Sequence, residues 1–359
     1  MAILLMQSWA LGKRCGTHGQ ALLSLACHLW RSYACFVFFS LFATMLGTAA
    51  LAYDPYPFQR SDGKWGYVNE DHCWVIEPQF ETAYEFSEGL AVVEIGDKRG
   101  FIDRTGAVAI RPQFRIAGSF REGLAMVLIG GGLGFIDKTG TMVITPQFSS
   151  AGCFSEGLAD VQLDDKRGYI DQSGTMVITP QFSSAGFFSE GLARVILKGK
   201  FGFIDKTGAF AFDHEFSSSH EFAEGLAAVE VGGKFGFIDR TGATVIEPKF
   251  DNAKDFADGL AAVRFGEKYM FIDKTGDIAI SSGFEDAHPF SDGLAAVKIG
   301  SKCGFIDKSG AVVINPQFDS AFSPFRQGRA KILMGEPLDL YTINKLGHIL
   351  LDPTCGLVT

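Results

Sequence analysis

The chain has 359 residues, of which 47% are hydrophobic, 20% are charged and 43 are glycine, and its net charge is −9 at pH 7. This acidic balance argues against nucleic acid and anionic lipid as partners, because both are bound through clustered Lys and Arg. The length alone would predict two or three domains, but an internal repeat predicts one body instead.

The first 52 residues differ in composition from the rest of the chain. They contain three Lys or Arg and no acidic residue, then an apolar run at 34–46, and they end in Ala50-Leu51-Ala52. This layout predicts a signal peptide over residues 1–52 that is cleaved before Tyr53. An uncleaved membrane anchor is the alternative, since an apolar stretch of about 20 residues can span a bilayer. We therefore expect an exported protein that is periplasmic, at the cell surface or extracellular.

A short string, Gly-(Phe/Tyr)-Ile-Asp, recurs every 34 residues after the leader. Its glycine stands at Gly66 and at each later period to Gly304, except that Met270 replaces it once. A ninth, weaker copy covers residues 342–347. A fixed period of about 20 to 50 residues is typical of stacked or toroidal repeat proteins. We predict nine tandem repeats over residues 53–353, followed by a tail at 354–359.

One repeat shows the predicted secondary structure. Residues 226–231 and 234–239 read as strands joined by a tight Gly232-Gly233 turn, and 243–246 as a third strand after a second turn. The glycines and the Val/Ile-rich runs exclude the two helices of other repeats that share this period. The remaining stretch, 250–256, reads as a connector whose Phe250 and Phe256 plug the layer between units.

The fold class is therefore all-β, with tandem three-stranded units. Each unit holds its own three strands, and no split unit is visible that would fasten a ring. A propeller blade also usually takes about 40 to 45 residues. We expect an open or superhelical stack, with a closed propeller-like ring as the alternative.

Two sets of carboxylates recur with the repeat. The first set opens a turn, and we expect its members to cap that turn and the glycine three residues later to need a positive φ, as at Gly106, Gly140 and Gly242. The second set precedes a turn glycine, and we expect it to be structural rather than a cation-binding ladder. The sets are Asp103, Asp137, Asp171, Asp205, Asp239, Asp273 and Asp307, and Glu88, Glu122, Glu156, Glu190, Glu224, Asp258 and Asp292.

No catalytic, metal or cofactor site is predicted. His214 and His220 are two residues too far apart for the zinc-protease pattern HExxH. There is no GxSxG, phosphate loop or dinucleotide fingerprint, so we predict a protein that is not an enzyme and has no cofactor. The cysteines after the leader are Cys73, Cys153, Cys303 and Cys355. Their oxidation state stays open, and Cys303 with Cys355 is the pair we favour if one forms.

A candidate binding surface follows from the first strand of each repeat. Its Ala-x-Val positions, such as Ala91 and Val93, are nearly constant and must be packed, so the opposite side is free to vary and to face a partner. That side would form a stripe along the body, with Arg194, Glu230, Arg264 and Lys298 as the candidate binding residues, against the alternative of a plain solvated face. The stripe positions are Val92, Met126, Asp160, Arg194, Ala228, Ala262, Ala296 and Lys331, with Glu94, Leu128, Gln162, Ile196, Glu230, Arg264, Lys298 and Leu333 two residues on.

The repeat resembles the WG-repeat (KWG-repeat) family of bacterial proteins. The likeness is carried by Lys64-Trp65-Gly66-Tyr67-Val68, by its later copies such as 200–208, and by the 146–159 stretch. It covers nearly all of the chain after the leader, although the tryptophan of the motif is kept only at Trp65. The resemblance implies a β-rich repeat protein, often exported, and carries over no catalytic residue.

These observations favour a non-enzymatic, exported binding or scaffolding protein whose partner is a protein or a cell-envelope polymer. A carbohydrate or cell-wall binding module is the alternative, and it would need exposed aromatic rings. Trp65, Trp74 and Tyr269 are the candidates for such rings.

Overall fold

The structure is a computed structural model that describes residues 54–212, 216–321, 323–335 and 338–353. The chain divides into two compact units, residues 1–52 and 53–359, and all of the described residues lie in the second unit. The predicted leader therefore falls outside the described residues.

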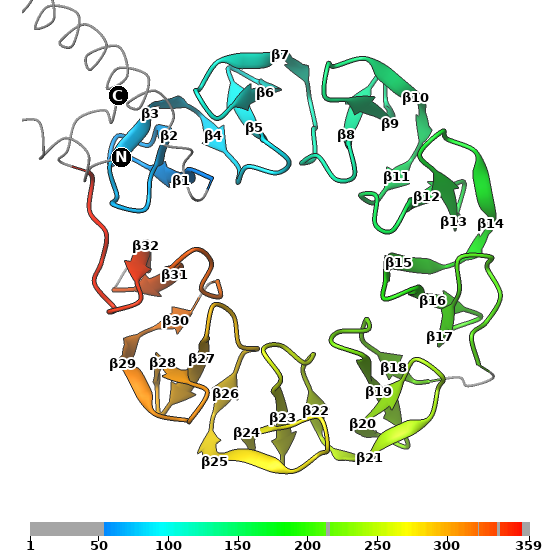
Figure 1. Cartoon of the computed structure of the whole chain (residues 1–359), viewed down its shortest axis with the longest axis vertical. Helices are drawn as coiled ribbons and strands as arrows, with labels where there is room; N and C mark the ends of the chain where they lie inside the picture. Colours follow the sequence, from blue (N-terminus) through cyan, green and yellow to red (C-terminus); the bar gives the residue numbers. More distant parts are fainter. Residues whose placement is uncertain (1–53, 213–215, 322, 336–337, 354–359) are drawn as a thin grey trace, which may run out of the picture. The chain divides into compact units, whose positions relative to one another are not determined.

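The second unit is a closed ring of small antiparallel sheets. Nine sheets follow one another along the chain, and Figure 1 shows them arranged around a central opening. We call each sheet a blade and number the blades in chain order from 1 to 9. The expected all-β repeat is confirmed. The expected open stack is wrong, and the alternative, a propeller-like ring, is what the structure shows.

Blades are built from up to four strands, which we name from the centre of the ring outward. The innermost strands are β4 (Thr82–Ala83), β11 (Ser150–Ala151), β15 (Ser184–Ser189), β18 (Ser218–Ser219), β22 (Asn252–Ala253), β26 (Asp286–Ala287) and β30 (Ser320–Ala321). The second strands are β1 (Tyr56–Gln59), β5 (Leu90–Ile95), β8 (Leu124–Ile129), β12 (Leu158–Leu163), β16 (Leu192–Leu197), β19 (Leu226–Val231), β23 (Ala261–Phe265), β27 (Leu294–Ile299) and β31 (Arg329–Met334).

The third strands carry the recurring glycine. They are β2 (Trp65–Val68), β6 (Lys98–Asp103), β9 (Gly132–Asp137), β13 (Lys166–Asp171), β17 (Lys200–Ile204), β20 (Lys234–Asp239), β24 (Lys268–Ile272), β28 (Lys302–Asp307) and β32 (Asp339–Asn344). The outermost strands lie on the circumference in Figure 1. They are β3 (Trp74–Phe80), β7 (Val108–Phe114), β10 (Met142–Phe148), β14 (Met176–Phe182), β21 (Thr244–Phe250), β25 (Ile278–Phe284) and β29 (Val312–Phe318).

The stretch that we predicted as a connector forms the innermost strand of the following blade. In blade 2 it continues past β4, because the Tyr84 N–H donates to Val92 O at 3.0 Å and the Ser87 N–H donates to Leu90 O at 2.8 Å. This short, irregular strand needs few residues, so four strands fit into a repeat of 34. With only three strands counted per unit, a repeat of 34 residues seemed too short for a propeller blade.

Two sheets end at their second strand on the inner side, β8 in blade 3 and β1 in blade 1. In blade 3 the inner segment still pairs through a bridge between Ala117 and Val127, whereas β1 has a free edge among the described residues. The Arg60 N–H donates across the hairpin to Lys64 O, and the alternation of antiparallel pairing then turns the backbone of Pro57 toward the free edge. Proline has no N–H to offer there, so it blunts the edge against pairing with another strand.

The hydrophobic core lies in the seams between consecutive blades. On one side of blade 2, Val92 and Phe101 pack against Ala125 and Val127 of blade 3, together with Phe120. The rings of Phe101 and Phe120 have centroids 4.8 Å apart. The predicted aromatic plug is thereby confirmed. The same ring pair recurs at Phe135–Phe154, Tyr169–Phe188, Phe203–Phe222, Phe237–Phe256, Phe271–Phe290 and Phe305–Phe325.

The recurring glycine is required by a close approach of the outermost strand. A Cβ on Gly100 would lie 2.6 Å from Ile110 O and 2.7 Å from Pro112 N, and no rotamer of a neighbouring side chain could relieve a clash with backbone atoms.

Blades 5, 7 and 9 depart from this pattern. Met270 replaces the glycine in blade 7, where Ser282 stands at the proline position, and Tyr341 replaces it in blade 9. Blade 5 keeps Gly202 but has His214 at the proline position, and a Cβ on Gly202 would lie 2.7 Å from Phe210 Cε1 instead.

Candidate functional site

The first set of recurring carboxylates caps the turns between third and outermost strands, as predicted. Asp239 Oδ1 accepts hydrogen bonds from the N–H groups of Thr241 and Ala243 at 2.8 and 3.1 Å and from the Thr241 hydroxyl at 2.6 Å. These hydrogen bonds hold the pKa of the Asp239 carboxyl below its usual value. The glycines that follow have the expected positive φ, 86° at Gly106 and 84° at Gly140 and Gly242.

The second set links each of blades 2 to 8 to the blade that follows it. Glu122 Oε2 accepts a hydrogen bond from the Gly157 N–H of the following blade at 2.8 Å, and Glu122 itself has a left-handed backbone, with φ of 52°. Equivalent hydrogen bonds reach Gly123, Gly157, Gly191, Gly225, Gly259, Gly293 and Gly328. These carboxylates therefore form a structural ladder around the ring.

The stripe of varying positions is less exposed than we expected. Val92 is 2% exposed, Asp160 6% and Ala262 0%, because in a ring both sides of the second strand face a neighbouring blade. The expectation of a free face is thus wrong for this row. The four candidate binding residues are half-buried in four different seams, and their role in binding stays a prediction. They are Arg194, Glu230, Arg264 and Lys298.

Blades 4 to 6 carry two ion pairs in their seams. Arg167 contacts the Asp160 carboxylate, and Arg194 Nε lies 3.0 Å from Glu221 Oε1. Burial raises the pKa of the Asp160 and Glu221 carboxyls, and the arginines only partly offset this. Glycines on the innermost strands make room for these carboxylates, since a Cβ on Gly186 would lie 2.2 Å from Glu221 Oε1.

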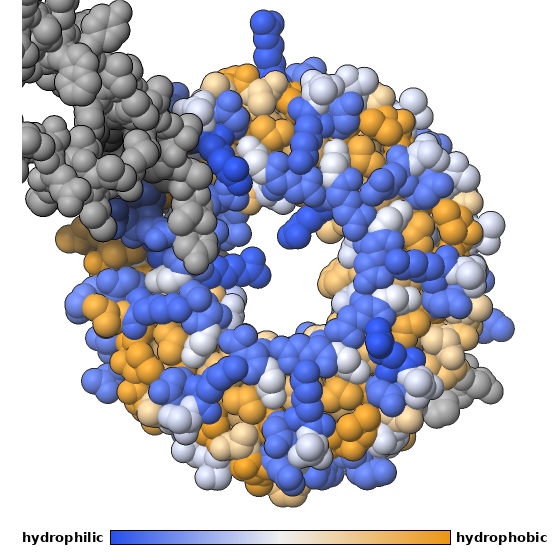
Figure 2. Space-filling model, viewed as in Figure 1, coloured by the Kyte–Doolittle hydropathy of each residue, from blue (hydrophilic) through white to orange (hydrophobic). Residues whose placement is uncertain are grey.

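The innermost segments differ most between blades. At one equivalent position stand Tyr84, Gly118, Gly152, Gly186, His220, Lys254 and His288, and at the next stand Glu85, Ser119, Cys153, Phe187, Glu221, Asp255 and Pro289. Figure 2 shows hydrophilic residues gathered around the central opening. Phe187 is nevertheless 49% exposed, so the wall offers both charged and apolar side chains.

Blades 9 and 1 meet at a seam unlike the other eight, which we call the closure seam. The carboxylate ladder cannot continue there, because Gln327 occupies the acceptor position in blade 9 and Pro55, one period before Gly89, has no N–H. In its place, Arg329 donates from Nη2 to the carbonyl oxygens of Asn69 and Glu70 in blade 1.

Arg329 is 6% exposed, and its guanidinium lies 5.4 Å from the centre of the Tyr56 ring. Leucine stands at this position in every earlier repeat from Leu90 to Leu294. Burial lowers the pKa of Arg329 and raises that of Tyr56 to about 12. A cation therefore holds the seam by binding carbonyl oxygens, where the seams between blade 2 and blade 9 use a leucine.

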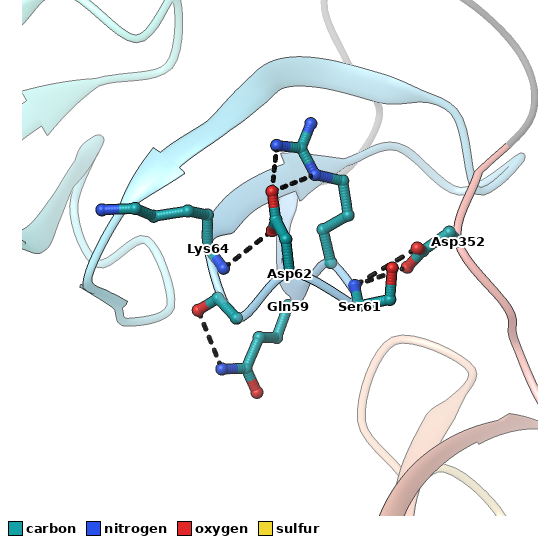
Figure 3. Close-up of polar contacts among 7 residues, drawn as sticks. Gln59, Ser61, Asp62, Lys64 and Asp352 are labelled. Carbon is teal, nitrogen blue, oxygen red and sulfur yellow. Dashed lines mark hydrogen bonds and ion pairs between the residues drawn. The ribbon is translucent and has the colours of Figure 1, made fainter.

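The end of the described chain also contacts blade 1. His72 Nε2 donates to Leu351 O at 2.6 Å, and His72 has a φ of 60°, at a position where later repeats have glycine. The carboxylate of Asp352 accepts from the Ser61 N–H at 3.2 Å, as Figure 3 shows. Leu350 packs against the buried cluster of blade 1. Within the described ranges, closure thus uses residues that occur once, and the sheets of blades 9 and 1 share no strand.

Three clefts border the closure seam. One of about 600 Å³ lies beside Glu70, Asp292, Gln327 and Lys345. A second of about 500 Å³ lies beside Trp65, Lys331 and Tyr341. A third of about 470 Å³ is lined by Tyr56 and Lys331 and by residues of innermost segments, Tyr84, Glu85 and Ser119. We call this third cleft the channel-side cleft.

Cysteine and histidine chemistry is sparse. Cys153 and Cys303 are free, so the suggested pairing of Cys303 is wrong. Cys73 is in a disulfide, and Cys355 lies outside the described residues. His220 pairs with Asp255 at 2.8 Å, whereas His214 lies outside the described residues.

Within the described ranges, no group of three or more His, Cys, Asp or Glu side chains is arranged to hold a metal ion. Nor does that part of the chain contain a helix long and apolar enough to cross a membrane. The predicted absence of a metal site and of catalysis is not tested by these observations.

The closure seam was not singled out from the sequence. Its residues depart from the repeat, whereas the candidate residues were chosen among positions that recur. A signal was nevertheless present, since Arg329 replaces leucine, Gln327 replaces a carboxylate and His72 replaces glycine, all within the first or the last repeat.

Comparison with known proteins agrees with the repeat. A family model described as "WG containing repeat" matches eight times, at residues 65–98, 100–132, 134–166, 168–201, 201–235, 235–269, 269–303 and 304–336. No curated protein matches the sequence.

Among solved structures, a eukaryotic initiation factor is similar at 11% identity, covering 82% of this chain and 94% of that chain with a TM-score of 0.59. BamB from Moraxella catarrhalis has 15% identity over 63% of this chain and 80% of its own, with a TM-score of 0.38. Kluyveromyces lactis Hsv2p has 9% identity over 74% and 96%, with a TM-score of 0.39. At such identities the first likeness supports the fold alone.

Proposed function

Since this chain belongs to the family of proteins built from the WG containing repeat, we propose that it is a non-enzymatic, exported scaffold that binds a protein or a cell-envelope polymer. The binding surface in this proposal is the wall of the central opening, formed by the innermost segments of the blades.

One observation carries the proposal. The polar residues that recur in every repeat are engaged in turns and in the ladder between blades, as with Asp239 and Glu122. The residues that differ from blade to blade gather on the innermost segments, where Cys153, Phe187 and Lys254 stand at neighbouring places. A ring of repeats presents such positions side by side around one opening, which suits an extended or protruding ligand.

The alternative of a carbohydrate-binding module is not favoured. Sugar rings stack on exposed aromatic side chains, but Trp74 is 5% exposed and Tyr269 is 8% exposed. Trp65 is half-buried at the closure seam. The three aromatic residues that the sequence offered for this role are therefore used in packing.

Export rests on the leader alone, which lies outside the described residues. We propose cleavage before Tyr53, because an apolar run followed by Ala50-Leu51-Ala52 is the pattern that signal peptidase recognises. N-terminal sequencing of the protein from its native membrane and soluble fractions checks this. A mature chain that begins at Tyr53 would support export, and one that retains residues 34–52 would favour the anchor.

Photo-crosslinking from the channel wall tests the binding role. Cys153 is free and exposed on the innermost segment of blade 4, so a benzophenone maleimide can be attached to it in a Cys303→Ser background. We expect a discrete crosslinked product with envelope material. The matched control carries Cys153→Ser and Val177→Cys, which moves the label to the outermost strand of the same blade, at a residue that is 42% exposed. Equal crosslinking from both positions, or none from Cys153, would contradict the proposal.

A further inference from the structure

The channel-side cleft has an excess of positive charge in a protein of net charge −9. Its lining includes Arg326, Arg329 and Lys331 but only one carboxylate, Glu85. Arg326 Nη1 lies 3.9 Å from Glu85 Oε2, so this carboxylate already has a cation beside it. Two positive charges, those of Arg329 and Lys331, are left without a carboxylate.

Lys331 is the less satisfied of the two. Its Nζ lies 5.2 Å from the centre of the Trp65 ring, and in the described ranges no hydrogen-bond acceptor or carboxylate partners this Nζ. The side chain is half-buried, and burial lowers the pKa of its ammonium, with Glu85 acting in the opposite direction. A half-buried ammonium that lines a cleft, with no carboxylate of the described residues beside it, is free to pair with an anion that enters from solution.

Packing of the seam does not explain this lysine. At the same position of the second strand, blades 6, 7 and 8 have Ala228, Ala262 and Ala296, which close their seams without any charge. Arg329, two residues before Lys331 on β31, has a structural role through its hydrogen bonds to Asn69 O and Glu70 O. Among the described residues, no comparable contact is made by the Lys331 ammonium.

We propose that the channel-side cleft binds a carboxylate of a partner polypeptide, which accepts a hydrogen bond from Lys331 and is attracted further by Arg329. The inference rests on the proposed function as a binding scaffold and names the chemical group that is recognised. A singly charged carboxylate fits better than a phosphate, because Glu85 in the same cleft repels a second negative charge. The rings of Tyr56 and Tyr84 line the same cleft and suit the methylene groups of an acidic side chain.

Isothermal titration calorimetry of the full chain tests this, with hexaglutamate as the probe and hexaglutamine and inorganic phosphate as comparisons. We expect Lys331→Met to weaken hexaglutamate binding about tenfold, since a charge-assisted hydrogen bond contributes about that factor. Lys331→Arg should retain most of the binding. The matched control is Lys249→Met, which removes the same charge from an exposed lysine on the outermost strand of blade 6, where its Nζ also lies 5.2 Å from an aromatic ring, that of Phe250, and which should leave the affinity within about twofold.

Thermal unfolding separates binding from a structural role. Lys331→Met should unfold at about the same temperature as the wild type, because the lost contact with the Trp65 ring is offset by the removal of a half-buried ammonium. A midpoint clearly below that of Lys249→Met would assign Lys331 to the fold instead. Equal hexaglutamate affinity for wild type and Lys331→Met would overturn the site, as would an equal loss in Lys249→Met. Tighter, Lys331-dependent binding of phosphate would overturn the choice of a polypeptide carboxylate. Failure here with a specific Cys153 crosslink would leave the scaffold function standing.

Discussion

At the scale of single residues, the repeat is defined by backbone geometry rather than by chemistry. The glycine of each third strand sits against the carbonyl and the proline of the outermost strand. A Cβ on Gly236, for example, would lie 2.4 Å from Ile246 O and 2.6 Å from Pro248 N. At Met270, where the glycine is lost, Ser282 stands in place of the proline. The most regular feature of the sequence is thus a packing constraint that says little about the ligand.

This constraint predicts the effect of adding one methyl group. Gly236→Ala should lower the free energy of unfolding by about 1–3 kcal/mol, the usual range for overpacking a dense site, as measured by urea denaturation. Gly118→Ala serves as the control, since a Cβ at that glycine would lie 3.8 Å from its nearest neighbour, the Met126 side chain, which is an ordinary contact distance. Finding Gly236→Ala as stable as the wild type would show that the outermost strand can move away freely.

The capping aspartates predict how stability depends on pH. Because hydrogen bonds lower the pKa of Asp239 in the folded state below its ordinary value of 3.8, its contribution is present above that value. The contribution is lost as the pH falls through the folded-state pKa. Asp239→Ala should therefore unfold at lower urea than the wild type at pH 7, and the two midpoints should converge in strong acid. A difference that stays constant with pH would argue that the carboxylate charge plays no part.

At the scale of elements, consecutive blades are joined by equivalent contacts. Each of blades 2 to 8 contributes an acceptor such as Glu122, whose carboxylate binds the backbone N–H of a glycine in the next blade, here Gly157 at 2.8 Å. The ladder gives the N–H groups of these turn glycines a hydrogen-bond acceptor, which water would otherwise have to supply. The same positions were read from the sequence as structural, which the hydrogen bonds confirm, although their reach into the next blade could not be seen from one repeat.

Breaking one rung of the ladder should have a moderate cost. We expect Glu122→Ala to reduce the free energy of unfolding by about 1 kcal/mol, the usual net value of one hydrogen bond, measured in urea. Gln327→Ala is a close control, because Gln327 holds the same place in blade 9, has a φ of 49° and, among the described residues, forms no rung. Equal effects of the two substitutions would mean that the rung itself contributes nothing.

The contacts at the closure seam predict that replacing Arg329 lowers the free energy of unfolding more than replacing an exposed arginine does. Arg329→Leu restores the residue of the other blades but leaves the carbonyl groups of Asn69 and Glu70 without their donor, so we expect a loss of about 1–3 kcal/mol. Arg240→Leu is the comparison, since this exposed arginine binds one carbonyl, Glu190 O, at 3.3 Å in another seam and should cost less than about 0.5 kcal/mol. If Arg329→Leu proves neutral, closure does not depend on the arginine.

At the scale of the whole molecule, the sequence predicted the repeating unit well and the assembly poorly. Local sequence patterns predict the strands, the turns at Gly106 and Gly242 and the aromatic plugs, and the same patterns recur in each repeat. The ring depends instead on Arg329 and His72, which occur once. The repeat pattern cannot reveal such residues, because they act only at the closure seam, where the last blade packs against the first.

The candidate binding surface was misplaced for a related reason. In an open stack one side of the second strand would face solvent, and the row through Val92 would be free to bind. In the ring that row faces the next blade, and Val92 is 2% exposed. The positions that differ most between blades lie on the innermost segments instead. Lys331 belongs to the original row, yet its significance appears only once blade 1 is placed beside it.

Ring closure is the claim on which both the channel wall and the channel-side cleft depend, and one distance tests it. Spin labels placed by Glu85→Cys and Arg326→Cys, with Cys153 and Cys303 changed to Ser, report on two residues whose charged groups lie 3.9 Å apart across the ring closure. In the closed ring, pulsed electron–electron double resonance should give a single short distance between the two spin labels. In an open stack, seven spacings of about 10 Å between sheets would separate the labels by about 70 Å, and a distance of that order would contradict the closed ring.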